Sequence, residues 1–527
     1  MTSTHRFNPA LNLETFAVQS TASAPPSINA LYLRDGVYDG MSRADVAATF
    51  AAFKGQTSIN RFALFFHGGL VDKSSGQQSA ANEFDAYKDV AFPLFFIWES
   101  GFGEVMSHHL PWIFAETIFG RVLKHSADVV TPKVGARQND LEEVATPVLT
   151  DEDIHTFLNA VQSDPDVQKE AAEIARSSQD ISSVPTEGVF PQSMQLSERT
   201  MLSPEVINSV RGAYWQAVGG NIDELPFGIS GAIQAAYSIA KAAVPVIVNT
   251  VRRFANGCDH GLQCTLVEEI LRALYIANFG AAVWEEMKKE TADAFGPDSN
   301  QFGGAAVVEE LCALIKSDLT RKVTLVGHST GGVYIGNFLQ NVDRALFAPG
   351  DANTSSDIIL LAPANTDDFL ANAYVPHQVR GIRVFQMKDE VEQQDHLLSK
   401  DVGPADPSIL GKVYPRSLLY LVSGVCEYLE GQDATGVHAF DGFDMPIMGM
   451  ERFYKLSAIF KDADYPSVNY LRELFPGDIP KPAFARVLSP TNACAPIGYR
   501  STALKHGNFP GDAPTIESLI HCFQNGL

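Results

Sequence analysis

The sequence predicts an α/β fold, in which helices cover both faces of a doubly wound, mostly parallel sheet. Short apolar runs recur along the chain, and each run ends where a loop signal begins. Because the runs are continuous rather than alternating, we expect strands that are buried on both faces, as in a parallel sheet. Helical patterns separate the runs, and this alternation is typical of the fold class. The expected strands are residues 30–38, 61–69, 92–101, 322–329, 357–364, 382–387 and 417–424.

The spacing of these runs is uneven and indicates insertions. The gap between residues 101 and 322 is far longer than a normal crossover connection, and its pattern is largely helical. A shorter gap follows the last expected strand. The expected division of the chain is a core of residues 1–102, 301–426 and 490–527, a mainly helical insertion of residues 103–300, and a second, smaller insertion of residues 427–489.

The composition is that of a soluble globular protein, with 45% hydrophobic and 19% charged residues among 527. A net charge of −23 argues against nucleic acid as a partner and gives no attraction to anionic membranes. The six cysteines are sparse and irregularly spaced, so we expect free thiols in a reducing compartment and no zinc site. No basic start followed by an apolar core is present at the N-terminus, so the sequence predicts a cytoplasmic protein.

Residues 227–254 are long and apolar enough to be mistaken for a membrane span. Gln234, Lys241 and Asn249 would then lie in hydrocarbon, and Pro245 interrupts the run. We therefore expect a buried or half-buried helix in a helical domain, and no transmembrane segment.

A serine stands where an expected strand stops and a helix starts. Residues 322–338, KVTLVGHSTGGVYIGNF, contain the pentapeptide 327–331, which matches G-x-S-x-G. Such a turn is strained and presses backbones together, so a Cβ at either glycine would clash. The turn would lift the Ser329 hydroxyl clear of the sheet and leave the Thr330 amide facing a substrate carbonyl oxygen. The pattern therefore predicts a nucleophile.

Residues 64–72, LFFHGGLVD, place His-Gly-Gly directly after an early buried strand. This pattern resembles the loop that donates another amide to an oxyanion hole. We expect Gly69 to donate that amide, with Leu70 as the alternative, beside the amide of Thr330.

The HGG loop, the buried strands, the GHSTGG turn and the later acid and histidine candidates together resemble the α/β-hydrolase superfamily. The resemblance covers roughly residues 28–101, 305–425 and 500–527. It implies a sheet of the α/β-hydrolase type with the large helical insertion as a cap. It also implies the chain order nucleophile, acid, histidine.

The resemblance places the acid just after a strand that follows the nucleophile. Residues 383–398, RVFQMKDEVEQQDHLL, end a strand and then offer several carboxylates. We expect Asp389 to be the acid because it comes directly past the strand. Asp395, in the same stretch, and Asp367 and Asp368, after the preceding strand, are the alternatives.

The histidine should lie in a late loop after the last strand. Of the thirteen histidines, His438, His506 and His521 follow the last expected strand. We expect His506 to be the general base, because a glycine, a turn-rich loop and an amphipathic terminal helix follow it. His521 lies inside that helix, and His67 and His328 are interpreted as structural members of their motifs.

These residues imply a serine hydrolase that cleaves a carboxylic ester with an apolar acyl or alcohol part. Ser329 would attack the carbonyl carbon, His506 would move the proton, and Asp389 would orient the imidazole. No metal or organic cofactor is expected, and the partner would be a small ester or a lipid-like substrate. A thioesterase, amidase or peptidase with the same triad stays open, as do a non-catalytic binding protein on a hydrolase fold and a lipid-surface protein.

The large insertion follows a strand whose carboxyl end should share an edge of the sheet with Ser329. Ligands of open α/β sheets bind at that edge, so an insertion rooted there would roof the pocket. Its apolar runs, such as residues 112–119 and 242–248, would line an acyl site. The alternative is that these helices only enlarge the core or bury an oligomer interface.

Overall fold

The computed structural model describes most of the expected core and of the large helical insertion, and a smaller share of the second insertion. The described residues are 27–69, 73–98, 110, 113–134, 147–177, 200–218, 229–276, 280–318, 320–342, 357–374, 379–395, 413–427, 444–455, 466–475 and 483–527.

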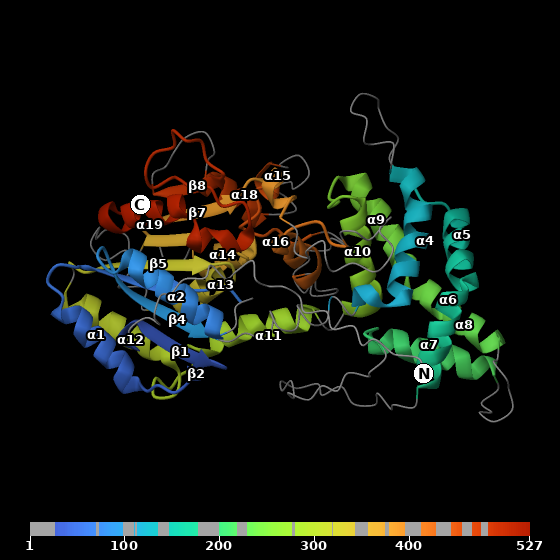
Figure 1. Cartoon of the computed structure of the whole chain (residues 1–527), viewed down its shortest axis with the longest axis horizontal. Helices are drawn as coiled ribbons and strands as arrows, with labels where there is room; N and C mark the ends of the chain where they lie inside the picture. The colour runs from blue at the N-terminus through green and yellow to red at the C-terminus, as the bar shows by residue number, and fades with distance from the viewer. Residues whose placement is uncertain are drawn as a thin grey trace, which may run out of the picture.

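A mixed, mostly parallel sheet of eight strands forms the centre of the α/β part, with the order β2-β1-β4-β3-β5-β6-β7-β8 (Figure 1). β1 and β2 run antiparallel, and the other neighbouring strands run parallel. β3, β4, β6 and β7 are buried along their whole length, as the continuous apolar runs predict. The strands are β1 (Ala30–Arg34), β2 (Val37–Tyr38), β3 (Arg61–Phe66), β4 (Phe92–Trp98), β5 (Lys322–His328), β6 (Asp357–Leu361), β7 (Gly381–Met387) and β8 (Phe484–Ser489).

The expected strand over residues 30–38 is divided into β1 and β2 by a tight turn. Asp35 and Gly36 have φ angles of 50° and 75°. Two-residue hairpin turns require this left-handed conformation, and Asp-Gly is a favoured pair for them. The chain therefore reverses, and β2 pairs with β1 as an antiparallel edge strand.

The expected strand over residues 417–424 is wrong, because this segment is helical. It forms α16 (Leu418–Leu421) and η7 (Val422–Cys426), and all of these residues are buried. A short apolar run that is buried on every side has no periodicity that separates strand from helix. The last strand is β8, which lies inside the range 427–489 that the sequence assigns to the second insertion. β8 is a half-buried edge strand that contains Arg486, so it lacks the continuous apolar pattern.

Helices cover both faces of the sheet, and each face has its own apolar core. Adjacent residues of β3 alternate between the two cores, with Leu64 in one and Phe65 in the other. The Leu64 side is covered by α1 (Arg43–Gly55), α12 (Gly303–Ser317) and α13 (Gly331–Asn341). The Phe65 side is covered by α2 (Lys73–Tyr87) and α19 (Ala513–Asn525).

A second lobe, which we call the helical lobe, lies beside the α/β part, and α11 (Gly280–Asp293) leads from it back to the sheet (Figure 1). Its helices are α4 (Thr117–Val134), α5 (Asp151–Ser163), α6 (Pro165–Arg176), α7 (Pro204–Ala217), α8 (Ile229–Ala242), α9 (Val244–Asn256), α10 (Leu262–Ile270) and η4 (Leu271–Ile276). The remaining short elements are η2 (Ser27–Asn29), α14 (Asp367–Ala373), α15 (Asp389–Glu392), α17 (Arg452–Lys455), α18 (Pro466–Leu474) and η8 (His506–Gly511).

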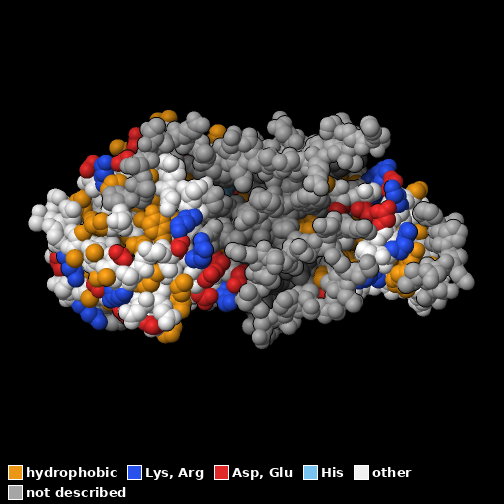
Figure 2. Space-filling model, turned by 60° about the horizontal axis from the view of Figure 1, so that its bottom comes forward, with side chains coloured by type: hydrophobic (Ala, Val, Ile, Leu, Met, Phe, Trp, Pro, Cys, Tyr) orange, Lys and Arg blue, Asp and Glu red, His pale blue; other side chains and the backbone are white. Residues whose placement is uncertain are grey.

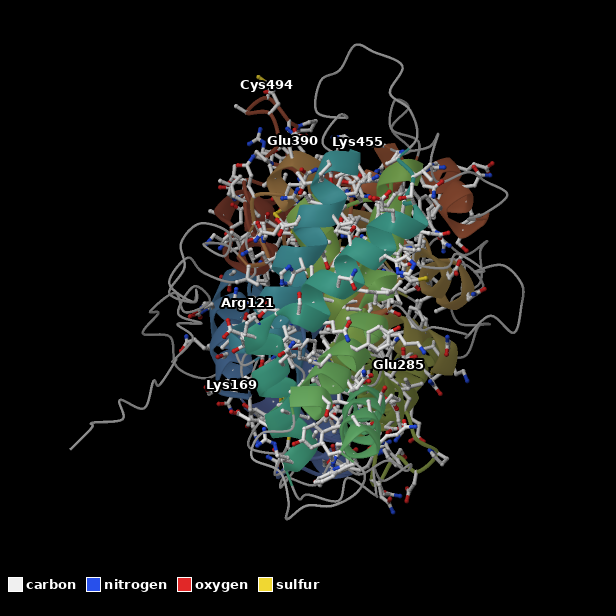
Figure 3. The ribbon with its side chains drawn as sticks, turned by 90° about the vertical axis from the view of Figure 1, so that its right-hand side faces the viewer. Arg121, Lys169, Glu285, Glu390, Lys455 and Cys494 are labelled. Atoms are coloured by element: carbon white, nitrogen blue, oxygen red, sulfur yellow. The ribbon has the colours of Figure 1, made fainter. Side chains whose placement is uncertain are left out.

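Polar contacts tie the helices of this lobe to one another. Arg121 of α4, labelled in Figure 3, forms an ion pair with Asp166 of α6. His125 of α4 contacts Asp164 at 2.8 Å, and Asp164 also caps α6 by accepting from the backbone of its first turn. Capping by Asp before an N-terminal proline explains why α6 begins where it does.

The apolar stretch of the helical lobe consists of α8 and α9. Residues Ser230–Asn256 are long and apolar enough, by length and composition alone, to cross a membrane, and 44% of the most apolar window is buried. Pro245 stands in the first turn of α9, where its missing amide proton is tolerated. On the face that Figure 2 shows, acidic and basic side chains are intermixed over the described surface.

Candidate active site

Ser329 lies in a sharp turn between strand and helix, as its motif predicts. β5 ends at His328 and α13 begins at Gly331. Ser329 has a φ of 55°, in the left-handed region that residues other than glycine rarely adopt. Its amide donates to the carbonyl of Leu361 (2.9 Å), and its own carbonyl accepts from the amide of Ala364 (3.1 Å). The loop after β6 therefore holds the strained backbone in place.

The two glycines of the motif are sterically required. A Cβ on Gly331 would lie 2.1 Å from the carbonyl oxygen of Phe66, and a Cβ on Gly327 would lie 2.7 Å from the backbone of Gly331. The expectation that a side chain at either position would clash is confirmed. The turn packs directly on the end of β3, which carries the HGG loop.

The HGG loop lies against the serine. A Cβ on Gly68 would be 3.0 Å from the Cβ of Ser329. Within the described residues the Thr330 amide donates to no protein acceptor, and it stands at the N-terminus of α13, where the helix dipole favours negative charge. The amide of Gly69 donates instead to Thr330 Oγ1 (3.2 Å). Of the expected oxyanion donors, Thr330 is open, Gly69 is engaged, and Leu70 lies outside the described residues.

His506 begins η8, in the loop that follows β8, and it is 5% exposed. His328 Nε2 donates to its carbonyl oxygen at 3.0 Å, and the two ring centroids are 5.2 Å apart. Neither ring nitrogen of His506 has a hydrogen-bond partner among the described residues. Burial, and then the neighbouring His328, lower its pKa well below 6.5. The imidazole is therefore neutral at pH 7 and able to accept a proton.

His67 and His328 hold backbone segments around the serine. His67 Nδ1 lies 2.8 Å from the carbonyl of Gly68, while its Nε2 accepts from the amide of Trp98 at 3.2 Å. These contacts place the His67 proton on Nδ1. Burial lowers the pKa of both histidines to about 4. Both side chains remain neutral and position the loops, which fits the structural role that the sequence assigns to them.

Asp395 contacts the segment that carries the candidate base. Its Oδ2 accepts from the backbone amide of His506 at 2.7 Å. Burial raises the pKa of Asp395, although the hydrogen bond from His506 and the charge of Lys505 oppose that rise. This alternative acid, and not the first choice, reaches the histidine.

Asp389 is engaged elsewhere. Its Oδ1 accepts from the hydroxyl of Tyr420 (2.6 Å), and its Oδ2 accepts from the side-chain Nε2 of Gln393 (2.9 Å). Its backbone amide donates to the carboxylate of Glu451 at 2.7 Å. In the described part of the chain Asp389 makes no contact with His506, so the structure does not bring the expected acid to the expected base.

Asp367 and Asp368 stand at the start of α14, away from the histidine. Asp367 is 1% exposed, and neither of its carboxylate oxygens has a hydrogen-bond partner among the described residues. Burial, together with the neighbouring Asp368, raises the pKa of Asp367 to about 7. Asp368 accepts from the hydroxyl of Ser467. Neither carboxylate contacts His506 in the described structure.

A cavity of about 620 Å³ joins Ser329 and His506, a size that suits a small-molecule site. It lies between the Phe65 side of the sheet, α2 and residues 502–514. Ser329 and His506 both line it. The other lining residues are Phe65, Phe66, His67, Gly68, Ser75, Gly76, Gln78, Ser79, Ala80, Asn82, Glu83, Phe95, Phe96, Ile97, Val326, His328, Leu361, Thr502, Ala503, Leu504, Gly507, Asn508, Pro510, Gly511, Asp512, Ala513 and Pro514.

No described residue of the helical insertion lines this cavity, so the described part of the insertion does not form the roof that the sequence predicts over it. None of the lining residues falls within residues 103–300. The helices of the lobe bury their apolar side chains against one another, so that Val210 of α7 and Ile247 of α9 are both 0% exposed. The described contact with the serine turn comes from α11, where Met287 Sδ accepts from Thr330 Oγ1 at 3.8 Å.

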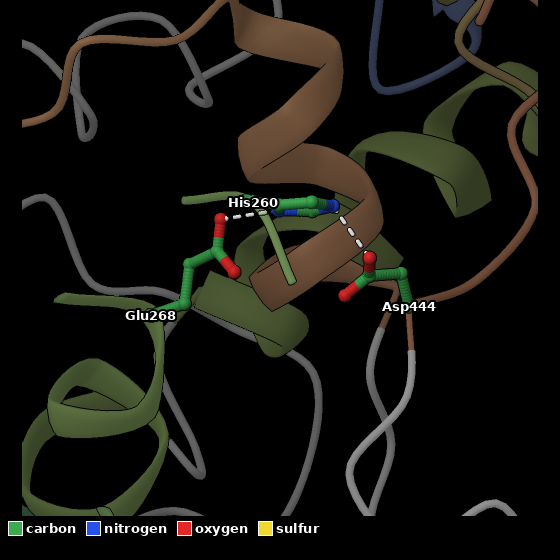
Figure 4. Close-up of side chains that lie close together, drawn as sticks. All are labelled: His260, Glu268 and Asp444. Atoms are coloured by element: carbon green, nitrogen blue, oxygen red, sulfur yellow. Dashed lines mark hydrogen bonds and ion pairs between the residues drawn. The ribbon is translucent and has the colours of Figure 1, made fainter. Parts of the chain in front are cut away.

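A second cluster of titratable side chains lies where the helical lobe meets residues 444–455. His260 Nδ1 is 2.7 Å from Glu268 Oε1, and its Nε2 is 2.5 Å from Asp444 Oδ2 (Figure 4). One ligand atom from each residue lies within 4.8 Å of the others, a spacing that a metal ion could use. The same space, however, holds Arg253, whose guanidinium nitrogens lie 2.7 Å from Glu268 and 2.7 Å from Asp444.

The charges of this cluster balance without a metal. Three buried guanidinium groups, those of Arg253, Arg272 and Arg452, lie within ion-pair distance of three buried carboxylates, those of Glu268, Glu269 and Asp444. Burial would raise the pKa of Glu268, but His260 and Arg253 outweigh it and lower the pKa to about 2. We interpret the cluster as a buried ion-pair network that fastens the helical lobe to the segment at Asp444.

Removing one charge from this network is expected to destabilise the protein strongly. Glu268→Gln leaves the buried His260 and Arg253 with one carboxylate fewer, and breaking a buried pair typically costs about 3–5 kcal/mol of unfolding free energy. Urea unfolding measures the change. Glu309→Gln is the matched control, because its ion pair with Arg43 is largely exposed and such pairs contribute less than about 1 kcal/mol. Equal losses for the two variants would contradict the network.

Two groups of residues could not be assigned from the sequence. Glu83 of α2 lines the cavity, and the His260 cluster joins residues far apart in the chain. A signal for Glu83 was present: Ser75, Ser79, Asn82 and Glu83 recur at the spacing of one helix face.

Comparisons of the chain with protein-family models, with curated proteins and with solved structures found no match. The function is therefore argued from the site itself.

Proposed function

We propose that this chain is a serine hydrolase of the α/β-hydrolase type that cleaves a carboxylic ester. The observation that carries the proposal is the placement of Ser329. Its backbone has a strained conformation at the end of β5, and Ser329 lines the same cavity as His506. Strain of this kind persists where the surrounding structure enforces it, commonly at active sites. The unpartnered imidazole of His506 and the open amide of Thr330 supply the other parts that acyl transfer needs.

In the proposed first half-reaction the Ser329 Oγ attacks the ester carbonyl carbon while His506 Nε2 takes the hydroxyl proton. The carbonyl oxygen becomes an oxyanion, which the Thr330 amide at the N-terminus of α13 stabilises. The tetrahedral intermediate then collapses. The bond to the alcohol oxygen breaks, and the alcohol leaves with the proton that His506 returns.

In the second half-reaction water attacks the acyl-serine, with His506 again moving the proton, and the carboxylic acid is released. Asp395 takes the place of Asp389 as the proposed acid, because it lies against His506. This role requires the His506 side chain to turn so that Nδ1 faces Asp395 and Nε2 faces Ser329. Catalytic hydrogen bonds often form only in the substrate complex.

Turnover of p-nitrophenyl butyrate by the full chain tests the proposal. We expect release of p-nitrophenol that saturates with substrate and that exceeds the rate for heat-denatured protein. A rate equal to the denatured control over a panel of acetate to octanoate esters would contradict a serine esterase.

The acid limb of the pH profile is expected below pH 6.5. The general base must be neutral, and burial followed by His328 lowers the pKa of His506 well below 6.5. A lowered pKa keeps the imidazole neutral as the pH falls, so kcat/KM should stay flat from pH 8 to 6.5 and decline only below that. An acid limb centred above pH 7 in protein that stays folded would contradict this assignment.

A further inference from the structure

One wall of the cavity has a polarity that the sequence did not lead us to expect. Glu83 Oε1 accepts from the hydroxyl of Ser79 at 3.0 Å, and its other oxygen has no donor among the described residues. Asn82 accepts weakly from Gln78 (3.4 Å), and its amide nitrogen donates to no acceptor in the described chain. This wall of α2 therefore offers both acceptors and a donor to a ligand.

The opposite wall is apolar. It comes from the Phe65 side of the sheet, where Phe65 and Phe95 stack with ring centroids 4.8 Å apart and Ile97, Val326 and Leu361 complete the surface. A ligand between the two walls would meet aromatic and aliphatic groups on one side and hydrogen-bonding groups on the other. Ring sugars and similar polyols have these two kinds of surface, with apolar C–H faces and hydroxyl edges.

The cavity is lined by His506, the side chain that would protonate the leaving alcohol in the proposed mechanism. Most of residues 502–514, which carry His506, line it, as do His67 and Gly68 of the HGG loop, whereas Gly69 and Thr330 do not. The alcohol oxygen receives its proton from His506, so the alcohol part extends past that side chain. In the proposed mechanism the oxyanion forms at the Thr330 amide, and Thr330 is not among the described residues that line the cavity.

We infer that the cavity binds the alcohol part of the ester and that this part is a hydroxylated ring, held by Glu83 and Asn82 against the Phe65 side of the sheet. The inference rests on the proposed ester hydrolysis at Ser329. Burial raises the pKa of Glu83 to about 7, an effect that the hydrogen bond from Ser79 partly opposes. At neutral pH the Glu83 carboxyl group is therefore present in both its protonated and its ionised form. Both forms can hydrogen-bond to hydroxyl groups, whereas only the ionised form attracts a cationic alcohol.

Two butyrate esters with matched alcohols test the inference. 6-O-butyryl-glucose and cyclohexylmethyl butyrate share the acyl group and place a six-membered ring one carbon from the ester oxygen, but only the first has hydroxyl groups. We expect kcat/KM of the full chain to favour the glucose ester by about tenfold or more, since a site built for hydroxyl groups rejects an analogue without them. Butyrylcholine serves as the cationic alternative.

Substitution of Glu83 should change this preference. Glu83→Leu is expected to lower the ratio of the two kcat/KM values by about ten- to a hundredfold, and Glu83→Gln, which keeps hydrogen-bonding atoms and the shape of the side chain, by less. Asp85→Asn is the matched control on the same helix, because Asp85 is exposed and pairs with Lys88. This control should keep the wild-type ratio.

The outcomes separate the two proposals. Suppose that Ser329 reacts with a fluorophosphonate and that both esters are cleaved. If the ratio of the two kcat/KM values is then near one, or is unchanged from the wild type in Glu83→Gln and Glu83→Leu, the inference is wrong and the proposed hydrolase stands. A preference for butyrylcholine would also overturn it. If Ser329 does not react and neither ester is cleaved, the proposed function fails and the inference fails with it. Melting temperatures show whether each variant is folded. If Glu83→Leu does not fold, the comparison of Glu83→Gln with the wild type tests the inference alone.

Discussion

Replacing Ser329 with alanine is expected to abolish ester hydrolysis, with kcat lower by about 10⁴-fold or more. The substitution removes the Oγ that forms the proposed acyl-enzyme. Stopped or steady-state assays with p-nitrophenyl butyrate measure the loss. The fold should persist, because Ser329 is already held in its turn by backbone hydrogen bonds to Leu361 and Ala364.

A comparison with glycine at the same position tests whether the strain belongs to the nucleophile. Ser329→Gly should be inactive as well, yet more stable than Ser329→Ala by about 0.5–1 kcal/mol, because only glycine adopts a left-handed φ without steric penalty. Thermal unfolding of the two variants measures the difference. Activity near the wild-type level in either variant would remove the central proposal.

Replacing Asp395 with asparagine is expected to lower kcat by a factor on the order of 10³ to 10⁴ with little change in KM. The carboxylate would hold the Nδ1 proton of His506 and stabilise the imidazolium that forms in the transition state. An amide favours the wrong tautomer and carries no charge. Steady-state kinetics with one activated ester give both constants.

Asp389→Asn and Asp367→Asn are the controls for this assignment. Asp389 bonds Tyr420 and Gln393, so its substitution should affect stability more than kcat. Asp367 lies at the start of α14 without a contact to the histidine, and its substitution should leave kcat close to the wild-type value. If Asp389→Asn abolishes activity and Asp395→Asn does not, the acid is the one that the sequence alone favours.

The sheet could be predicted where the sequence contains a strong local signal. Both faces of the central strands are buried, so their sequences are largely apolar runs; these strands are β3, β4, β5, β6 and β7. The glycines on either side of Ser329 are required because the turn packs against the end of β3. The segment 417–424 has the same kind of run but forms a helix, since full burial removes periodicity. β8 was missed for the opposite reason: an edge strand that contains Arg486 needs only a half-buried pattern.

The choice among the acids depended on geometry that no local pattern contains. Asp389 and Asp395 follow β7 within eight residues, and both satisfy the order that the family resemblance implies. Only the fold of α15 and of the loop before His506 decides which carboxylate reaches the histidine. The His260 network is of the same kind, because Asp444 is 184 positions from His260 in the chain. Tertiary packing also explains why no described residue of the helical lobe lines the cavity, since the apolar faces of its helices are buried within the lobe.

Labelling with a fluorophosphonate, followed by mapping of the modified peptide, tests the central claim most directly. The reagent reacts with a serine only when a base and an oxyanion site activate it. We predict a single modified tryptic peptide, residues 323–344, in which Ser329 carries the phosphonate and which is absent from labelled Ser329→Ala protein. No labelling of folded wild-type protein, or labelling at another serine that persists in Ser329→Ala, would contradict the account.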